Sequence, residues 1–429
     1  MSAFQTVRGM RDFLPEEAKI MKYIEGKVRR TAELYGYKEI MTPVVESHEL
    51  LATKAGEEVR LRMYAFQDLG GRMVALRPEF TPSVARLVAT ILRTEPKPFR
   101  LFCLGSLYRY DEPQRGRYRE FWQSDFELIG SEKPEADAEI LMLTNSLMKM
   151  AGLKNYSFKV GHVGILRGVL SEEKLDDKAQ NAALQLMDKK QYEEAITFIK
   201  DSGASKKCLS ILRDLVQLKG GKALEIVENV KACVKDYNAA LAAAENLGEI
   251  LRLTLDSGCE LNMTVDAGFA RGLEYYTGMI LEVNTPELDV AVAGGGRYDK
   301  LVELFGGQPT PATGIAHGID RIMLAMQLQK VAIGTGEEKT VMIIPVKEEL
   351  KGEAVKIAHM LREESVPVEV EVMGRKVTKA LEDADRRKMD YAIIVGEREL
   401  KEGAVVLRNL AKREQTTVKI KNIIEMIRG

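Results

Sequence analysis

The first apolar pattern along the chain has the spacing of an amphipathic helix. Apolar residues recur every three or four positions between Glu16 and Tyr35, with lysine, arginine and glutamate between them. This spacing predicts a helix over the range, and Gly36 follows where such a helix would end. Residues 37–46 then predict a strand that runs into Pro43, a residue that suits a strand end or an edge strand.

Two further strands are predicted over residues 99–110 and 121–130, and a polar, arginine-rich loop over residues 111–119 joins them. Two strands connected in this way indicate an antiparallel hairpin. Loops commonly carry function because a rigid scaffold positions their side chains. We therefore expect a hairpin with a long functional loop.

A change of composition marks the middle of the chain. Lysine, glutamate, alanine and leucine dominate residues 166–255, which predicts a block of helices. Apolar runs near Met263, at 279–283 and at 288–293 predict that strands resume after this block. The helical block therefore interrupts a β-rich domain, as an inserted domain would.

The last part of the chain has the pattern of a separate α/β domain. Residues 331–340 contain glycines and charged residues, and we interpret them as a linker. Strand and helix patterns alternate after it, and the runs 341–346 and 391–395 are apolar on both faces. Such runs indicate parallel strands covered by helices, so residues 339–429 are expected to form a domain of their own.

Composition changes this picture mainly by exclusion. The 429 residues are 45% hydrophobic and 30% charged, which is ordinary for a folded protein of two to four domains. No stretch approaches the roughly 18 uncharged apolar residues of a membrane-spanning helix. The start lacks the apolar core of a signal peptide. We therefore predict a cytoplasmic protein without a membrane partner.

Charge and metal-binding residue types narrow the function further. The 63 basic and 64 acidic residues give a net charge of −1, so local basic patches would have to hold any polyanion. The four cysteines and four histidines are scattered along the chain. This scatter indicates neither a disulfide framework nor a protein-held transition metal.

Polar and apolar residues alternate along the second strand of the predicted hairpin. Gln123, Asp125 and Glu127 fall on one face, opposite an apolar face. One interpretation is a strand half exposed to water. The other is a site that holds a phosphate ester beside an amine, because arginines crowd the neighbouring loop. These arginines are Arg109, Arg115, Arg117 and Arg119.

Four other segments could carry chemistry, and each also has a plainer interpretation. Residues 77–82 hold a carboxylate and a hydroxyl between two prolines, or form a turn that enters a helix near Ser83. Residues 271–278 place an arginine and two tyrosines before an apolar strand. The glycines of residues 293–299 would let a backbone approach a ligand closely, but they match no P-loop or dinucleotide fingerprint and could equally form a turn. Arg321 opposes the dipole of its helix, which an anion or water would offset.

Taken together, these segments resemble the motifs of a histidyl-tRNA synthetase, a member of the class II aminoacyl-tRNA synthetases. Residues 36–46 are similar to motif 1, residues 109–127 to motif 2 with its Arg-x-x-Glu and Gly-Arg-Tyr-Arg, and residues 314–321 to motif 3. Arg-Gly-Leu-Glu-Tyr-Tyr from residue 271 and Ala-Gly-Gly-Gly-Arg-Tyr-Asp from residue 293 resemble the two histidine-specific signatures. The opening from Arg8 to Pro15 is also similar to the start of that family.

The resemblance implies an α+β fold. Its catalytic domain, an antiparallel sheet flanked by helices, would take residues 1–165 and 256–328. A helical insertion would take residues 166–255, and an α/β anticodon-binding domain residues 339–429. The implied reaction activates L-histidine with ATP and Mg²⁺ to histidyl-adenylate and transfers the histidyl group to tRNA(His). The implied assembly is a homodimer that pairs through motif 1.

The resemblance also implies a role for individual residues. Arg109 and Arg271 would act in catalysis at the α-phosphate, Arg117 and Arg321 would bind the other phosphates, and Glu112 would lie near the adenine. Further residues would bind histidine. They are Glu79, Thr81 and Gln123 for the ammonium group, Glu127 and Tyr276 for the imidazole, and Tyr298 for the pocket wall.

Two alternatives share parts of this pattern. A catalytically inactive, synthetase-like regulatory subunit of ATP phosphoribosyltransferase has the same catalytic fold, but typically lacks the last domain and degrades the signatures. A regulatory module like the synthetase-like region of a stress-responsive kinase would also have broken motifs. Here the motifs are intact and residues 339–429 are present, which favours the synthetase.

Overall fold

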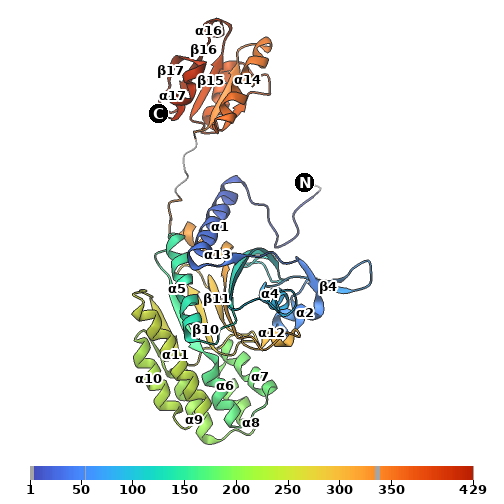
Figure 1. The fold of residues 1–429 in the computed structure, drawn as a ribbon, viewed down its shortest axis with the longest axis vertical. Coiled ribbons are helices and arrows are strands. Elements are labelled where there is room, and N and C mark those ends of the chain that lie inside the picture. The colour runs from blue at the N-terminus through green and yellow to red at the C-terminus, as the bar shows by residue number, and fades with distance from the viewer. Residues whose placement is uncertain (1–3, 54, 334–338, 429) are drawn as a thin grey trace. The chain divides into compact units, whose positions relative to one another are not determined.

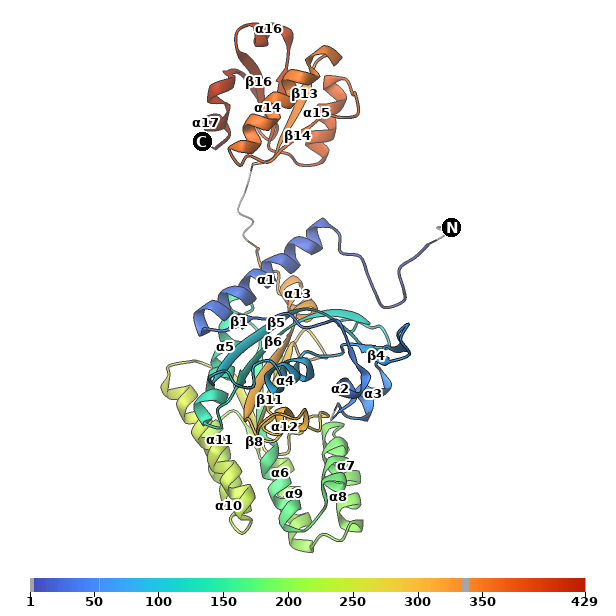
Figure 2. The ribbon, with the colours of Figure 1, turned by 45° about the vertical axis from the view of Figure 1, so that its right-hand side comes forward.

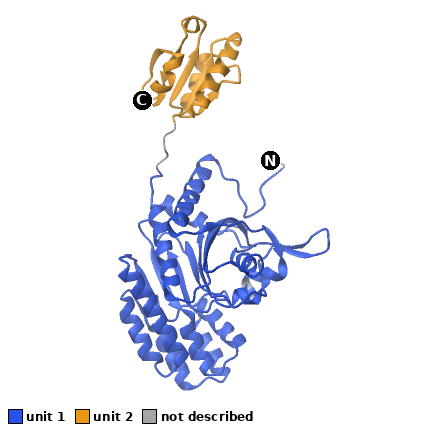
Figure 3. Ribbon diagram, in the orientation of Figure 1, with its two compact units in different colours: residues 1–333 blue, residues 334–429 orange. Residues whose placement is uncertain are grey.

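The computed structural model describes residues 4–428, apart from residue 54 and residues 334–338. Contacts divide the chain into two units, Met1–Ile333 and Gly334–Gly429 (Figure 3). Each unit has hydrophobic clusters of its own, so we describe each by itself. The helical block predicted at 166–255 belongs to the first unit by these contacts, and the finer domain boundaries stay predictions.

A nine-stranded sheet forms the centre of the first unit (Figures 1 and 2). Neighbouring strands are antiparallel except in the first pair and the last pair but one. This sheet and its helices give the expected α+β class. From one edge to the other the strands are β1 (Lys38–Glu39), β5 (Phe99–Tyr108), β6 (Glu120–Ile129), β12 (Ala312–Gly318), β11 (Ala293–Arg297), β10 (Met279–Asn284), β7 (Ser157–His162), β9 (Met263–Asp266) and β8 (Lys219–Gly220).

Long helices pack on one face of this sheet (Figure 2). The first confirms the helix predicted from the apolar spacing: it buries Met21, Ile24 and Val28 and ends before Gly36. The three helices that cover this face are α1 (Pro15–Tyr35), α5 (Pro134–Met150) and α13 (Ile319–Leu328).

The predicted hairpin is confirmed, because β5 and β6 pair antiparallel along their whole length. Phe126 points to the helix-covered face, where its ring lies 5.2 Å from that of Tyr37 and 5.6 Å from that of His317. Since neighbouring residues of a strand alternate between faces, Asp125 and Glu127 point to the opposite face. That opposite face carries the candidate site.

The helical block between β7 and β9 is also confirmed (Figure 1). Its helices pack mainly on one another, and α11 also packs on α5. Apolar residues at helical spacing supply the shared core, as lysine and glutamate cover the outside. The helices are α6 (Val163–Glu172), α7 (Asp177–Asp188), α8 (Tyr192–Asp201), α9 (Lys206–Gln217), α10 (Ala223–Val234) and α11 (Asn238–Asp256).

A small three-stranded sheet and short helices complete the first unit. In both ribbon views the strand β4 belongs to a projection beside α2, and Figure 2 also labels α3 there (Figures 1 and 2). The strands are β2 (Val45–Ser47), β4 (Met73–Leu76) and β3 (Ala65–Gln67), and the helices are α2 (His48–Ala52), α3 (Glu57–Leu61), α4 (Thr81–Ala89) and α12 (Leu301–Leu304).

The strand predicted over residues 37–46 is wrong in its centre. Its two ends form β1 and β2, which belong to different sheets. Between them, the carbonyl oxygen of Thr42 accepts a hydrogen bond of 2.6 Å from Nη1 of Arg77, and Pro43 has no N–H to donate. A strand cannot continue where the backbone groups are occupied or missing.

The strand predicted over residues 288–293 is wrong as well. Only Ala293 belongs to a strand, β11, which continues through the glycines to Arg297. A Cβ atom on Gly295 would collide with the backbone of Gly314 on the neighbouring strand. The glycine run is therefore a tightly flanked central strand and not a turn.

The second unit contains the predicted alternation of strands and helices around a five-stranded sheet. The expected parallel pairing is confirmed for β13 with β14 and with β15, whereas the antiparallel hairpin of β16 and β17 was not predicted. Residues 334–338 of the predicted linker lie outside the described residues. In sheet order the strands are β14 (Val368–Val370), β13 (Val341–Pro345), β15 (Tyr391–Val395), β16 (Ala404–Asn409) and β17 (Glu414–Lys419), and the helices are α14 (Lys351–Glu363), α15 (Val377–Arg386), α16 (Glu397–Lys401) and α17 (Ile423–Arg428).

Candidate active site

A cavity of about 810 Å³ lies on the open face of the nine-stranded sheet. Its walls come from β6, β11 and β12, the loop between β5 and β6, the segments around residues 79–81 and 271–276, and the turn between α7 and α8. Every residue to which the sequence assigned a role lines this cavity, except Glu112. Segments far apart in the sequence therefore meet at one site.

Glu112 lies elsewhere. Its carboxylate pairs at 2.9 Å with the guanidinium of Arg8, and both side chains are largely exposed to solvent. Arg115 and Arg119 of the same loop are also absent from the cavity wall. The side chain of Arg119 instead lies over the ring of Tyr110. The arginine-rich loop thus contributes only part of its charge to the cavity.

Carboxylates gather at one end of the cavity, and Glu127 is the best connected of them. It is buried, and it accepts hydrogen bonds from the hydroxyl groups of Thr81, at 2.7 Å, and of Tyr298. Burial raises the pKa of Glu127 to about 7, although these two hydrogen bonds oppose the shift. A carboxylate has about four lone-pair positions, so Glu127 can still accept from a ligand N–H.

Glu79 is a second buried carboxylate of this end. Its Oε2 accepts a 2.9 Å hydrogen bond from the hydroxyl of Tyr275, and its Oε1 has no hydrogen-bond partner in the described part of the chain. Burial raises the pKa of Glu79, and Arg109 opposes the rise. The sequence singled out two adjacent tyrosines but assigned a role only to Tyr276. The contact with Glu79 gives one to Tyr275, and no sequence pattern distinguished between the two.

The polar face of β6 is buried. Asp125 and Glu127 are each 2% exposed, and Gln123 lines the same cavity. The interpretation of this face as half exposed to water is therefore wrong. The strand packs its apolar face against helices and turns its polar face into the cavity.

Arginines gather at the other end of the cavity. Nη1 of Arg271 pairs with Oε1 of Glu282 at 2.6 Å. A Cβ atom on Gly294 would lie 2.6 Å from that same nitrogen. Gly294, the first glycine of β11, thus leaves the space that the Arg271 side chain fills. The position of Arg271 therefore depends on a glycine in a distant segment of the sequence.

Arg321 is held by backbone carbonyl groups. Its Nε donates to the oxygen of Gly116 at 3.0 Å and its Nη1 to the oxygen of Ala291 at 2.7 Å. Burial lowers the pKa of Arg321 to about 10, and the charges of Arg109 and Arg117 add to the effect. Arg321 is therefore not the exposed arginine of the plainer interpretation. A cluster of mutually repelling cations favours an anionic ligand.

Arg109 lies between the two ends. Its Nε donates to the carbonyl oxygen of Pro78 at 2.9 Å, next to Glu79. Its charge acts on the carboxyl groups of Glu79 and Asp125 and also on Arg321. The cavity therefore has an acidic end and a basic end that meet at one arginine.

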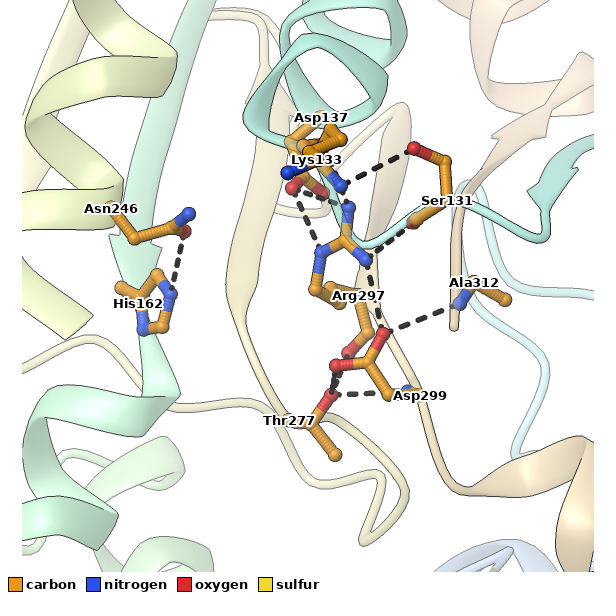
Figure 4. Close-up of polar contacts among 9 residues, drawn as sticks. All are labelled: Ser131, Lys133, Asp137, His162, Asn246, Thr277, Arg297, Asp299 and Ala312. Carbon is orange, nitrogen blue, oxygen red and sulfur yellow. Dashed lines mark hydrogen bonds and ion pairs between the residues drawn. The ribbon is translucent and has the colours of Figure 1, made fainter. Parts of the chain in front are cut away.

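A polar network around Arg297 joins the segment that contains Thr277 to the segment that contains Arg297 and Asp299 (Figure 4). The guanidinium of Arg297 pairs with Asp137 at 2.7 Å and with Asp299 at 3.0 Å. Asp299 also accepts a 2.9 Å hydrogen bond from the hydroxyl of Thr277. Because Thr277 follows Tyr276 and Arg297 precedes Tyr298, the network fixes the two tyrosines relative to each other.

The helical block reaches the site through α7. Oε2 of Glu274 accepts from Nδ2 of Asn181 at 3.3 Å, next to the tyrosines. Met187, Lys190 and Tyr192, from the end of α7 and the start of α8, line the cavity. The sequence gave no sign of this contribution, because these positions carry no motif.

Among the side chains that the structure describes, no group of three or more His, Cys, Asp or Glu residues is arranged to hold a metal ion. In the same part of the chain, no helix has the length and apolar character needed to cross a membrane.

Comparison with known proteins decides the family. A model described as histidyl-tRNA synthetase matches residues 9–322, and one described as an anticodon binding domain matches residues 340–429. The chain belongs to the histidyl-tRNA synthetase family. A curated relative, the histidine--tRNA ligase of Methanocaldococcus jannaschii, is 42% identical over 420 residues, which cover 97% of this chain and 98% of that protein.

Solved structures of the histidyl-tRNA synthetase family agree. The apo histidyl-tRNA synthetase of S. aureus is 26% identical with a TM-score of 0.70, and the match covers 99% of each chain. A protein described as an ATP phosphoribosyltransferase regulatory subunit/histidyl-tRNA synthetase, from Bacillus halodurans C, is 27% identical with a TM-score of 0.76. That match covers 89% of this chain and 97% of that one.

Proposed function

We propose that the protein activates L-histidine with ATP and transfers the histidyl group to tRNA(His). The observation that carries the proposal is the cavity that buried carboxylates and four arginines line together. Such a cavity suits an amino acid whose carboxylate must approach a triphosphate, because ammonium and imidazole N–H groups need acceptors and phosphates need cations. Family membership supports the same reaction.

In the first step a histidine carboxylate oxygen attacks the α-phosphorus of ATP, and pyrophosphate leaves with the electron pair of the broken P–O bond. Arg109 and Arg271 would stabilise the charge that grows on the α-phosphate. Arg117 and Arg321 would hold the departing phosphates. We propose that Mg²⁺ enters with ATP, bound to the phosphate oxygens of that substrate.

In the second step a ribose hydroxyl at the end of the tRNA attacks the carbonyl carbon of histidyl-adenylate, and AMP leaves. The ATP–pyrophosphate exchange assay tests the first step, and charging of tRNA(His) tests the second. Exchange that depends on histidine, and on no other amino acid, supports the proposal. Absence of exchange in the folded protein would favour the regulatory-subunit alternative, which the second unit and the intact signatures oppose.

We propose that the protein is a homodimer. Large apolar side chains are exposed on the three-stranded sheet and on the segment before β2. In that segment Met41 is 89% exposed. Burial of such a surface in a two-fold interface would remove it from water. The exposed residues are Met41, Val44, Val45, Phe66 and Met73.

Val45→Asp is expected to convert the dimer to monomers of 48.0 kDa, because a carboxylate would have to be desolvated in an apolar interface. Sedimentation equilibrium at micromolar concentration measures the mass. Val355→Asp is the matched control, since Val355 is also exposed but lies on α14 of the second unit. A wild-type protein that sediments only as a monomer contradicts the proposal.

We propose that the second unit binds the anticodon region of tRNA(His). Six basic residues between positions 375 and 388 are candidates for this contact, but ion pairs neutralise several of them. Arg375 pairs with Glu371 and Asp383, at 3.2 and 3.0 Å, and Arg387 pairs with Glu369 at 2.6 Å. A tRNA phosphate would therefore have to compete with these carboxylates for the two arginines. The six residues are Arg375, Lys376, Lys379, Arg386, Arg387 and Lys388.

A chain that ends at residue 335 is expected to keep ATP–pyrophosphate exchange and to lose most of its affinity for tRNA. Each unit has its own hydrophobic clusters, and the cavity lies wholly within the first unit. Exchange and charging are measured on the same truncated protein. Loss of both activities in a folded dimer would show that the units are coupled, whereas loss of neither would show that the second unit does not contribute to tRNA binding.

A further inference from the structure

We propose that Asp125 is a third acceptor for the α-ammonium group of bound histidine, beside Glu79 and Gln123. The proposal rests on the activity proposed above and assigns a residue for which the sequence suggested no individual role.

Among the residues that the structure describes, three buried oxygen atoms of the cavity lack a hydrogen-bond partner. They are Oε1 of Glu79, Oε1 of Gln123 and Oδ1 of Asp125. Buried polar atoms are nearly always hydrogen-bonded in folded proteins, because an unpaired one keeps its full cost of desolvation. Unpaired oxygens gathered in one cavity therefore indicate a ligand with N–H or O–H donors. An ammonium group carries three N–H donors, which matches the set.

Glu79, Gln123 and Asp125 line the same cavity. Gln123 and Asp125 are two positions apart on β6, so their side chains point to the same face. The carboxyl group of Asp125 also interacts with the backbone N–H of Phe80, the residue next to Glu79. This interaction places the carboxyl group of Asp125 beside the Glu79 segment.

Charge supports a cation at this place. Burial raises the pKa of Asp125 well above its usual range, and the charges of Glu127 and Glu79 raise it further, while Arg109 opposes them. Tyr298, Cys103 and Arg77 are further titratable groups that interact with Asp125. Three buried carboxyl groups, those of Glu79, Asp125 and Glu127, thus face the single positive charge of Arg109. An ammonium group would supply further positive charge.

Thr81 is a weaker candidate for the third contact than the family resemblance implied. Its hydroxyl group already donates to Oε1 of Glu127 at 2.7 Å. That bond orients the carboxylate expected to meet the imidazole. We therefore assign Thr81 to positioning Glu127, although its oxygen retains a lone pair that can face the ligand.

The test compares histidine with 3-(imidazol-4-yl)propionate, which has the same ring and carboxylate but no amino group. In the exchange assay, Asp125→Asn is expected to raise the KM for histidine by about 10- to 100-fold, the usual range for a hydrogen bond to a charged group. The inhibition constant of the analogue is expected to change by less than about threefold, because the analogue makes no ammonium contact. The KM for ATP should also stay near the wild-type value.

Ser83→Ala is the matched control, since Ser83 has a buried, unpaired oxygen that does not line the cavity. Its two constants should stay at wild-type values. If Asp125→Asn shows no exchange, equilibrium binding of both compounds to Asp125→Ser gives the same comparison. Equal changes for histidine and the analogue, or no change for either, would overturn the proposal. Histidine-dependent exchange in the wild type tests the proposed activity separately.

Discussion

Arg271→His is expected to lower the rate of ATP–pyrophosphate exchange by about a hundredfold, the order of magnitude for removal of one positioned donor that stabilises a growing negative charge. The reason is geometric. Glu282 holds the guanidinium at 2.6 Å, and Gly294 leaves the space in which it lies. A histidine side chain is too short to keep that contact and place a cation at the same point. The KM for ATP should change much less, because the other arginines remain.

Arg100→His is a suitable control for this experiment. Arg100 also pairs with a carboxylate, that of Glu139 at 2.7 Å, but it does not line the cavity. Its exchange rate should stay near that of the wild type. Near-normal exchange by Arg271→His would remove Arg271 from the transition state of the first step.

Glu127→Ala is expected to raise the KM for histidine by about a hundredfold or more and to leave the KM for ATP nearly unchanged. The substitution removes the acceptor proposed for an imidazole N–H. It also leaves the hydroxyl groups of Thr81 and Tyr298 without their acceptor, at about 1–3 kcal/mol for each buried group. Steady-state exchange kinetics with each substrate varied in turn measures both constants.

Glu127→Gln separates the two contributions, because an amide keeps the volume and one acceptor oxygen. Its KM for histidine should fall between those of the wild type and Glu127→Ala. Equal effects of Glu127→Ala on the two substrates would instead mean that Glu127 supports the fold of the cavity and does not recognise the amino acid.

The sequence predicted those parts of the structure that depend on short-range periodicity. The helix α1, the hairpin of β5 and β6 and the helical block were predicted because apolar spacing and turn residues are local signals. The strands around Pro43 and before Gly294 were misplaced for another reason. The first boundary depends on the hydrogen bond from the guanidinium of Arg77 to the carbonyl oxygen of Thr42, and the second on the close approach of β11 to β12. Both are contacts between segments that are distant in the sequence.

The residues of the site also fall into those that a local sequence pattern indicates and those that only the folded structure reveals. Alternation along β6 already placed Asp125 between Gln123 and Glu127 on one face, so the signal for Asp125 was present in the sequence. No such signal existed for the hydrogen bond between Tyr275 and Glu79. None existed for the exposed position of Glu112 either, because the folded structure decides which residues of the loop reach the cavity.

The glycines of the central strands restrict how this site could evolve. A Cβ atom at Gly294 would press on Arg271, and one at Gly314 would overlap the carboxylate of Glu127. The two glycines lie on the neighbouring strands β11 and β12, two positions out of register, since Gly294 pairs with Ala316 and Gly314 with Gly296. The phosphate side and the imidazole side therefore share one stretch of backbone. A heritable change of amino acid preference that began with a larger residue at Gly314 would displace Glu127, and one that began at Gly294 would displace Arg271.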